Sequence, residues 1–142
     1  TGFASLPTSR HAADGLLLHQ AYILSAVRCA PPANKPTPEE IHRCLDHLEA
    51  EVAALPDLAV VVALGRIGFD AWIQLLRRLG TTRTPRPAFG HGVEVDLGTT
   101  GAHPRWLLGC YHPSRQNTNT GTLTPPMMHA VFRRARRLAD LD

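Results

Sequence analysis

Residues 59–65 read Ala-Val-Val-Val-Ala-Leu-Gly, a continuous apolar run rich in β-branched side chains and closed by a glycine. β-Branched residues favour strands, and a run without polar alternation is typical of a strand covered on both faces. Two further runs, over residues 21–27 and 105–111, have strand length and a mostly apolar character. We therefore predict three buried strands.

Amphipathic helices are predicted after these strands. Thr37, Pro38 and Glu40 form the pattern of an N-cap, a proline at the first helical position and a capping box. Apolar residues then recur at helical spacing, as they do again before Gly80 and after Pro125. The three apolar stripes are Ile41, Leu45, Leu48, Val52 and Leu55; Phe69, Trp72, Ile73, Leu76 and Leu79; and Met127, Met128, Val131, Phe132, Ala135 and Leu138.

Residues 93–97 alternate between apolar and acidic side chains, which indicates a half-exposed strand at the edge of a sheet. The resulting order of strands and helices predicts an α/β sheet with helices on its faces. A length of 142 residues suits one domain. In such sheets ligands gather outside the carboxyl ends of the strands, where we expect the loops 29–36, 65–67 and 112–124.

The charge distribution permits a polyanionic partner. Fifteen Lys and Arg against twelve Asp and Glu give a formal charge of +3. Acidic residues gather between Glu39 and Asp57, and a one-sided distribution suits nucleic acid, although a solvated basic face explains it equally well. The arginines of the last predicted helix are Arg133, Arg134, Arg136 and Arg137.

Composition also bears on the compartment. No apolar run approaches the roughly 20 residues of a membrane span. Three cysteines are an odd count, which argues against a disulfide framework, and we expect a cytoplasmic protein.

Cys29 and Cys44 form one candidate metal-binding pair. Cys29 follows the first predicted strand, and Cys44 lies in the second turn of the next helix. Thiolates suit zinc or an iron–sulfur cluster, but both need about four ligands. On spacing alone, two buried structural cysteines are the preferred interpretation.

His112 and the polar segment after it form the second candidate site. This segment carries hydroxyls, amides and Arg115 but no carboxylate, a composition that suits phosphate or base contacts. His112 could donate a hydrogen bond to an oxygen that gains negative charge in a transition state. A surface loop with Asx turns is the alternative. Asn34 is expected at the same edge, where its amide could read a base or orient water, although its pattern is that of a turn residue.

Together these segments resemble the type-5 uracil-DNA glycosylases. Residues 26–40 with Cys44 are similar to the middle of that family, and residues 62–66 to its next strand and turn. Residues 111–118, with Thr120-Gly121 and Leu123-Thr124, are similar to its DNA-insertion motif. Because two long motifs occur in the right order with a matching strand between them, the resemblance is specific.

The resemblance implies one domain with a three-layer α/β/α sandwich around a mostly parallel sheet, of which residues 1–142 are the C-terminal part. It implies an enzyme that hydrolyses the N-glycosidic bond of uracil, and of deaminated bases such as hypoxanthine and xanthine, in DNA. His112 matches the histidine that faces the flipped base, and Asn34 an asparagine beside it. The residues that match those entering the duplex are Ser114, Arg115, Gln116 and Asn117.

The resemblance further implies a [4Fe-4S] cluster held by four cysteines, of which Cys29 and Cys44 match the third and fourth. The family's glycine-rich motif, its water-positioning acid and its first two cysteines all precede this region. We therefore expect residues 1–142 to be a fragment. We also expect it to be monomeric and to associate with no membrane. Its expected partners are DNA with deaminated bases and the missing N-terminal segment. The alternatives are a non-catalytic iron–sulfur module that binds nucleic acid and, third, a redox sensor unrelated to DNA.

Overall fold

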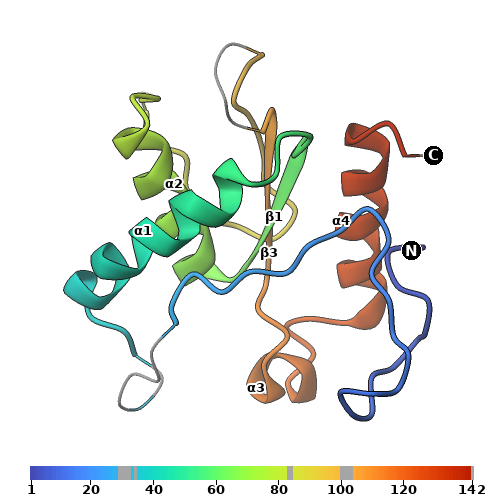
Figure 1. Cartoon of the computed structure of the whole chain (residues 1–142). Helices are drawn as coiled ribbons and strands as arrows, with labels where there is room; N and C mark the ends of the chain where they lie inside the picture. Colours follow the sequence, from blue (N-terminus) through green and yellow to red (C-terminus); the bar gives the residue numbers. More distant parts are fainter. Residues whose placement is uncertain (29–32, 34, 83–84, 100–103, 142) are drawn as a thin grey trace.

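The computed structural model describes residues 1–28, 33, 35–82, 85–99 and 104–141. Figure 1 shows α1 and α2 on one side of the strands and α4 on the other, as the sequence predicts. Among the described residues, no helix has the length and apolar character needed to cross a bilayer. The elements are α1 (Pro38–Ala53), β1 (Val60–Leu64), α2 (Arg66–Arg78), β2 (Glu94–Asp96), β3 (Trp106–Cys110), α3 (Arg115–Asn119) and α4 (Pro125–Leu138).

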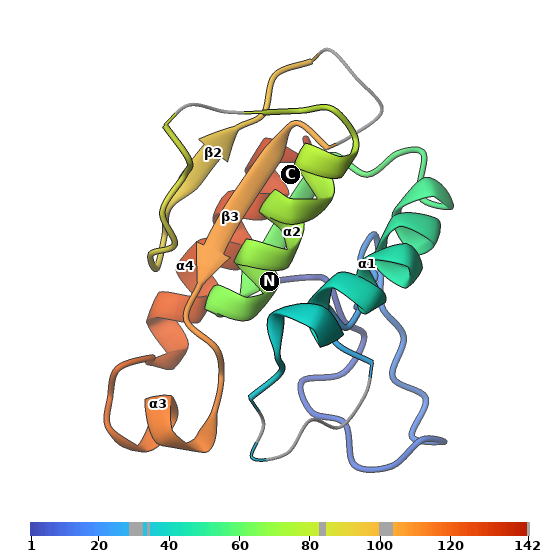
Figure 2. The same ribbon diagram turned by 90° about the vertical axis from the view of Figure 1, so that its left-hand side faces the viewer.

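The described strands form a mixed sheet in the order β1-β3-β2. β1 is parallel to β3, with Val62 opposite Leu108, and β2 is antiparallel to it, with Val95 opposite Leu107. The prediction of an alternating edge strand near residue 95 is confirmed, because β2 lies at the edge and buries only its central residue (Figure 2). One pairing of each kind means that the described strands alone do not make the sheet mostly parallel.

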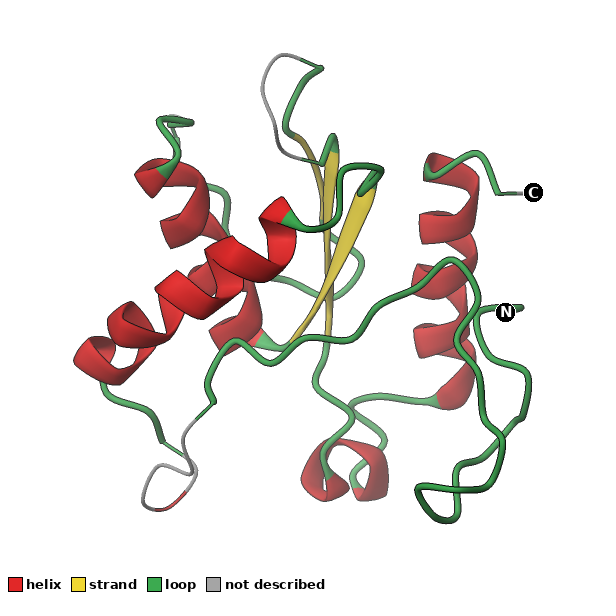
Figure 3. Cartoon of the chain, viewed as in Figure 1, coloured by secondary structure: helices red, strands yellow, loops and turns green. Residues whose placement is uncertain are grey.

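The strand predicted over residues 21–27 is wrong for this structure. These residues are loop (Figure 3), and the side chains of Tyr22 and Ile23 are 60% and 76% exposed. Among the described residues, no backbone hydrogen bond joins this run to β1. A strand forms only where its N–H and C=O groups find partners on a neighbouring chain, and an apolar run of the right length does not supply that neighbour.

Two apolar layers hold the helices against the sheet. Successive strand residues point to opposite faces, so Leu107 joins the layer under α1 and α2, whereas Leu108 joins the layer under α4. β3 is buried over most of its length because it has a strand on each side and helices over both faces.

The helix ends follow the sequence closely. The Thr37 hydroxyl accepts a hydrogen bond from the Glu40 backbone N–H at 3.2 Å, and the Glu40 carboxylate accepts one from the Thr37 N–H at 2.7 Å. This is the predicted capping box. After α2, Gly80 has φ +86° and donates to the Arg77 carbonyl, and Thr81 donates to Leu76, which together form a Schellman motif.

Asp14 holds the loop of residues 9–16 together. Its carboxylate accepts hydrogen bonds from the backbone N–H groups of Arg10 at 2.6 Å and Leu16 at 2.9 Å, and from the Ser9 hydroxyl at 3.0 Å. The hydrogen bond from Arg10, followed by that from Leu16, lowers the pKa of Asp14 from 3.8 to about 2.

We expect this loop to loosen in acid. Because the folded pKa lies below the ordinary value, the stabilisation by Asp14 is complete above pH 3.8 and is lost as the pH falls to about 2. Amide chemical shifts of Arg10 and Leu16 should follow that titration. An Asp14→Asn variant is the control, and the prediction fails if its amides titrate in the same way.

Candidate functional site

The candidate site lies where the two parallel strands end. Leu64 of β1 stands opposite Cys110 of β3, and the Gly65 N–H donates to the Cys110 carbonyl at 2.8 Å. Gly65 has φ +100°, and a Cβ on it would lie 3.1 Å from the Cβ of His112. A glycine is required at this position because a side chain would be strained and would press on the histidine. Two of the three predicted loops therefore meet at His112.

The N-terminus of α2 adjoins this histidine. α2 begins at Arg66, directly after Gly65, and no side chain caps it. The free N–H groups and the dipole of a helix start favour negative charge nearby. His112 is exposed, and its side chain forms no hydrogen bond or ion pair with the residues that the structure describes. The imidazole is available to a ligand that carries or develops negative charge.

The polar segment after His112, which was expected to be a loop, contains the short helix α3. Ser114 caps α3, since its hydroxyl accepts a hydrogen bond from the Asn117 N–H at 3.2 Å. The Asn117 side-chain amide donates to the His112 carbonyl at 2.9 Å. The Asn117 backbone carbonyl accepts a hydrogen bond from the backbone N–H of Leu123, which is buried. These bonds hold α3 in a fixed position beside His112, below the sheet in Figure 1.

The four residues that match the duplex-entering motif separate into two pairs. Ser114 and Asn117 are half-buried and bonded within the segment. Arg115 and Gln116 are exposed, and within the described part of the chain their side chains form no hydrogen bond or ion pair. Arg115 and Gln116 are therefore the two that present polar side chains to solvent, whereas Ser114 and Asn117 brace the segment.

His91 supports the exit of β3 and was not selected from the sequence. Its Nδ1 accepts a hydrogen bond from the Tyr111 N–H at 3.1 Å, and the two rings lie 5.0 Å apart. Phe89 packs between Tyr111 and Phe69, with ring centroids 6.2 Å and 5.7 Å away. This aromatic group fixes the residue that precedes His112. No local pattern reveals the contact, because it joins residues 20 positions apart.

Gly109 allows this support to approach β3. The Gly109 N–H donates to Val93 at 2.9 Å, and its carbonyl accepts from Gly92 at 2.8 Å. A Cβ on Gly109 would lie 2.4 Å from the Gly90 carbonyl oxygen and 2.8 Å from the Val93 Cγ1. Only a glycine permits such close backbone packing.

Of the two predicted metal ligands, Cys29 and Cys44, only Cys44 lies among the described residues. Cys29 and Asn34 lie outside the described residues, so their predicted roles stay predictions. Cys44 is buried in α1. Cys110 is fully buried in the apolar layer under α4, where burial raises the pKa of its thiol.

An iron–sulfur cluster needs more ligands than this part of the chain provides. No group of three or more His, Cys, Asp or Glu able to hold a metal occurs among the residues that the structure describes. A [4Fe-4S] cluster takes four thiolates. The described residues alone therefore do not fit such a cluster.

The arginines of α4 are less available than the sequence suggests. Arg134 forms two hydrogen bonds with the Glu94 carboxylate, at 2.7 Å and 2.9 Å, and this contact lowers the pKa of Glu94. Arg136 packs on the Phe3 ring, 5.4 Å from its centroid. Arg133 and Arg137 stay exposed, and their spacing of four places them on one face of the helix. On α4, the exposed arginines that could face a polyanion are thus reduced to these two.

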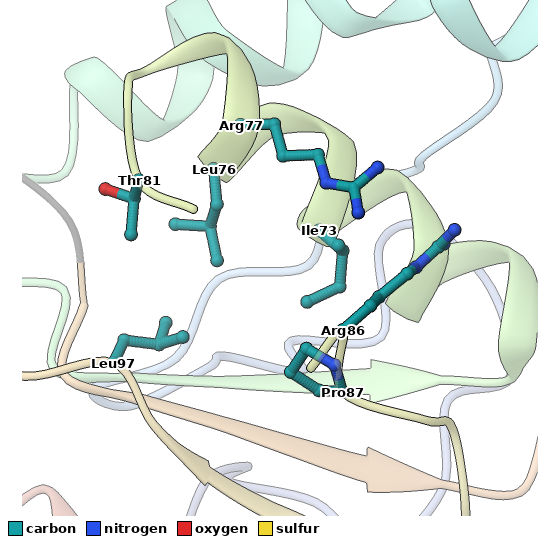
Figure 4. A pocket seen from close by; sticks show the side chains of 7 residues that line it. All are labelled: Ile73, Leu76, Arg77, Thr81, Arg86, Pro87 and Leu97. Atoms are coloured by element: carbon teal, nitrogen blue, oxygen red, sulfur yellow. The ribbon is translucent and has the colours of Figure 1, made fainter. Parts of the chain in front are cut away.

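A small hollow lies away from His112, beside the C-terminal half of α2 (Figure 4). Asp70 and Arg86 form an ion pair of 2.8 Å nearby. No predicted site residue borders the hollow, so we do not assign it to the candidate site. Its lining residues are Ile73, Leu76, Arg77, Thr81, Arg86, Pro87 and Leu97.

Comparisons with known proteins agree with the sequence resemblance. A family model described as the uracil DNA glycosylase superfamily matches residues 4–136. A type-5 uracil-DNA glycosylase of Mycobacterium bovis is 49% identical over 142 residues, which cover 99% of this chain and 50% of the relative. One from Thermus thermophilus is 46% identical over 140 residues, which cover 99% of this chain and 60% of the relative. The chain thus spans only about half of the length of such relatives.

A type-4 relative matches a shorter region. The type-4 uracil-DNA glycosylase of Archaeoglobus fulgidus is 41% identical over 63 residues, which cover 43% of this chain and 31% of the relative.

Proposed function

The chain belongs to the uracil-DNA glycosylase superfamily, and we propose that it forms part of a DNA-repair enzyme that flips a deaminated base from DNA and hydrolyses its N-glycosidic bond. The observation that carries this proposal is the position of His112. Its exposed imidazole stands at the carboxyl ends of two parallel strands, between an uncapped helix start and α3.

Uracil is the substrate named for the type-5 relatives. We include hypoxanthine and xanthine in the proposal. Deamination gives each of these bases a carbonyl oxygen that a histidine N–H can reach with a hydrogen bond, so one donor serves all three.

Base flipping is the first step of the proposed reaction. An enzyme cannot reach the glycosidic bond of a stacked base, and extrusion costs a few kcal/mol. Arg115 and Gln116 would offset this cost, Gln116 by occupying the vacated space and Arg115 by binding a phosphate. Ser114 and Asn117 would keep α3 rigid during insertion, because their polar groups are already bonded within the segment.

Bond cleavage is the second step. The departing base takes the bonding electrons, so negative charge grows on its carbonyl oxygen while the sugar becomes positive. His112 would donate a hydrogen bond to that oxygen, and the start of α2 would favour the same charge. Water then adds to the sugar. We propose that Asn34 holds the base or this water, and that the activating acid comes from outside residues 1–142.

The remaining proposals concern the whole protein. We propose that residues 1–142 are the C-terminal part of one α/β/α sandwich with a mostly parallel sheet, and that the protein is monomeric and cytoplasmic. Cys29 and Cys44 would provide two of four thiolates for a [4Fe-4S] cluster. When bound, the cluster would order the chain that leads into α1, and we assign it no step in the reaction.

A chimera provides the direct test of function. Residues 1–142 would replace the matching part of the Thermus thermophilus relative, which keeps the portion of the enzyme that this chain does not cover. We expect excision of uracil from duplex DNA by the chimera and none by residues 1–142 alone. A chimera that binds DNA and carries the relative's acid but leaves uracil in place would instead indicate a non-catalytic module.

Removing Arg115 should weaken DNA binding in a salt-dependent way. Each phosphate contact adds about 0.9 to the slope of log affinity against log salt concentration, so Arg115→Ala should lower that slope by about this amount. Fluorescence anisotropy with a short duplex measures it. Arg78→Ala is the matched control, because Arg78 is paired with Asp46 and Glu49 between α1 and α2. Equal slopes for the two variants would exclude a phosphate contact at Arg115.

A further inference from the structure

A bulge interrupts the pairing of β3 with the chain that leads into β2. Gly92 and Val93 both stand opposite Gly109: the Gly92 N–H donates to the Gly109 carbonyl at 2.8 Å, and the Gly109 N–H donates to the Val93 carbonyl at 2.9 Å. Gly92 has φ +75°. Two residues opposite one, with a left-handed glycine first, form a G1 β-bulge, and bulges beside functional sites re-aim side chains.

The turn before the bulge lies beside the end of β3 (Figure 2). The Val93 N–H donates to the Gly90 carbonyl at 3.3 Å. His91 is thus the second residue of a β-turn, and Gly92, with its positive φ, is the third. A type II turn requires that conformation at its third residue, which favours glycine. The sequence Gly-His-Gly-Val therefore specifies the turn, and the turn determines where the imidazole lies.

His91 takes the place of a backbone carbonyl in the ladder. Alternate residues of a strand bond the same antiparallel neighbour, so the Tyr111 N–H points to the same side of β3 as the Gly109 N–H. The partner backbone has turned away at this point, and the His91 Nδ1 accepts from the Tyr111 N–H at 3.1 Å. Because Nδ1 accepts, the neutral ring carries its proton on Nε2. A proton on Nδ1 would place two donors face to face and break the contact.

We propose that His91 is a positioning residue for base excision, whose Nδ1 fixes Tyr111 and thereby the direction in which His112 leaves β3. This role rests on the proposed function of His112, and we assign His91 no contact with the base. His112 is held from its other side as well, because its carbonyl accepts from the Ser114 N–H at 2.8 Å and from the Asn117 amide at 2.9 Å. The histidine therefore stands between two fixed points, as a hydrogen-bond donor aimed at one oxygen requires.

Two substitutions separate the acceptor from the ring. His91→Phe keeps a flat ring against Tyr111 but loses Nδ1, whereas His91→Asn keeps an acceptor, Oδ1, at the same number of bonds from the backbone. In the chimera, His91→Phe should lower the single-turnover rate of uracil excision by about 10–100-fold, since a misplacement of about 1 Å can cost about 10²-fold. Affinity for the duplex should not change, and His91→Asn should recover most of the rate. A wild-type rate for His91→Phe, or equal losses in the two variants, would overturn the proposal.

A double substitution shows whether His91 acts through His112. In a chimera that carries His112→Ala, adding His91→Phe should cost no further rate, because the group that His91 positions is gone. A general loss of stability would instead lower the rate equally in both backgrounds. If the two losses multiply, His91 acts independently of His112 and the proposed role is wrong.

Nitrogen NMR of residues 1–142 tests the contact without any enzyme activity. We expect the neutral His91 ring to carry its proton on Nε2. The Tyr111 amide should exchange slowly in the wild type and in His91→Asn, and about tenfold or more faster in His91→Phe. A proton on Nδ1, or equal exchange of Tyr111 in all three proteins, would contradict the role of His91. An inactive wild-type chimera would refute the proposed function, whereas an active chimera in which His91→Phe keeps the full rate would refute only the positioning role.

Discussion

Replacing His112 with alanine is expected to lower the rate of base excision by about 10²–10³-fold, because the variant loses a hydrogen-bond donor to the oxygen that becomes negative. DNA binding should change little, since Arg115 and Gln116 remain exposed on α3. Single-turnover excision by the chimera, at saturating enzyme, measures the chemical step separately from binding. His112→Gln keeps an N–H donor and should recover part of the lost rate.

A second histidine makes the test specific. His129 is also exposed but lies on α4, and His129→Ala should excise uracil at the wild-type rate. If His112→Ala retained that rate as well, the proposed donor would be wrong. If the affinity for uracil-containing DNA fell while the rate at saturating enzyme stayed at the wild-type value, His112 would act in binding the flipped base and not in the transition state.

The fold was predictable wherever a feature depends on nearby residues. The start of α1 follows from the capping box at Thr37, and the end of α2 follows from the glycine at position 80. The hydrogen bonds of both motifs join residues no more than five positions apart. The run before Gly65 is a strand because β3 pairs with it. The equally apolar run 21–27 has no partner among the described residues and remains loop. Composition gives the preference for a strand, but only tertiary structure provides the second half of its hydrogen bonds.

The site was predictable only in outline. The meeting of Gly65 and His112 follows from the rule that parallel strands bring their carboxyl ends together. The helix α3 was missed because it buries no residue and has no apolar stripe; its one local indication is Ser114 three positions before Asn117. His91 was missed because its partner Tyr111 is distant in the sequence.

Gly109 controls both stability and the position of the site. It lies in β3, the central strand, and its missing side chain leaves room for the backbone of residues 90–93. Two hydrogen bonds hold this segment at the same place: the Gly109 N–H donates to the Val93 carbonyl, and the Gly92 N–H donates to the Gly109 carbonyl. The segment carries His91, which bonds the residue before His112. A change at Gly109 should therefore reach the edge of the sheet that carries His112.

Gly109→Ala is accordingly expected to destabilise the protein by about 1–3 kcal/mol or more, as overpacking of a core does. The new Cβ would lie 2.4 Å from a backbone oxygen, which cannot move aside as a flexible side chain can. Urea unfolding measures the loss. Gly90→Ala is the control, because a Cβ there meets no atom within 4 Å, and it should keep or slightly raise the free energy of unfolding. The amide resonance of Tyr111 should shift in Gly109→Ala and not in the control. Wild-type stability of Gly109→Ala would mean that residues 90–93 are not held against β3 as closely as this contact requires.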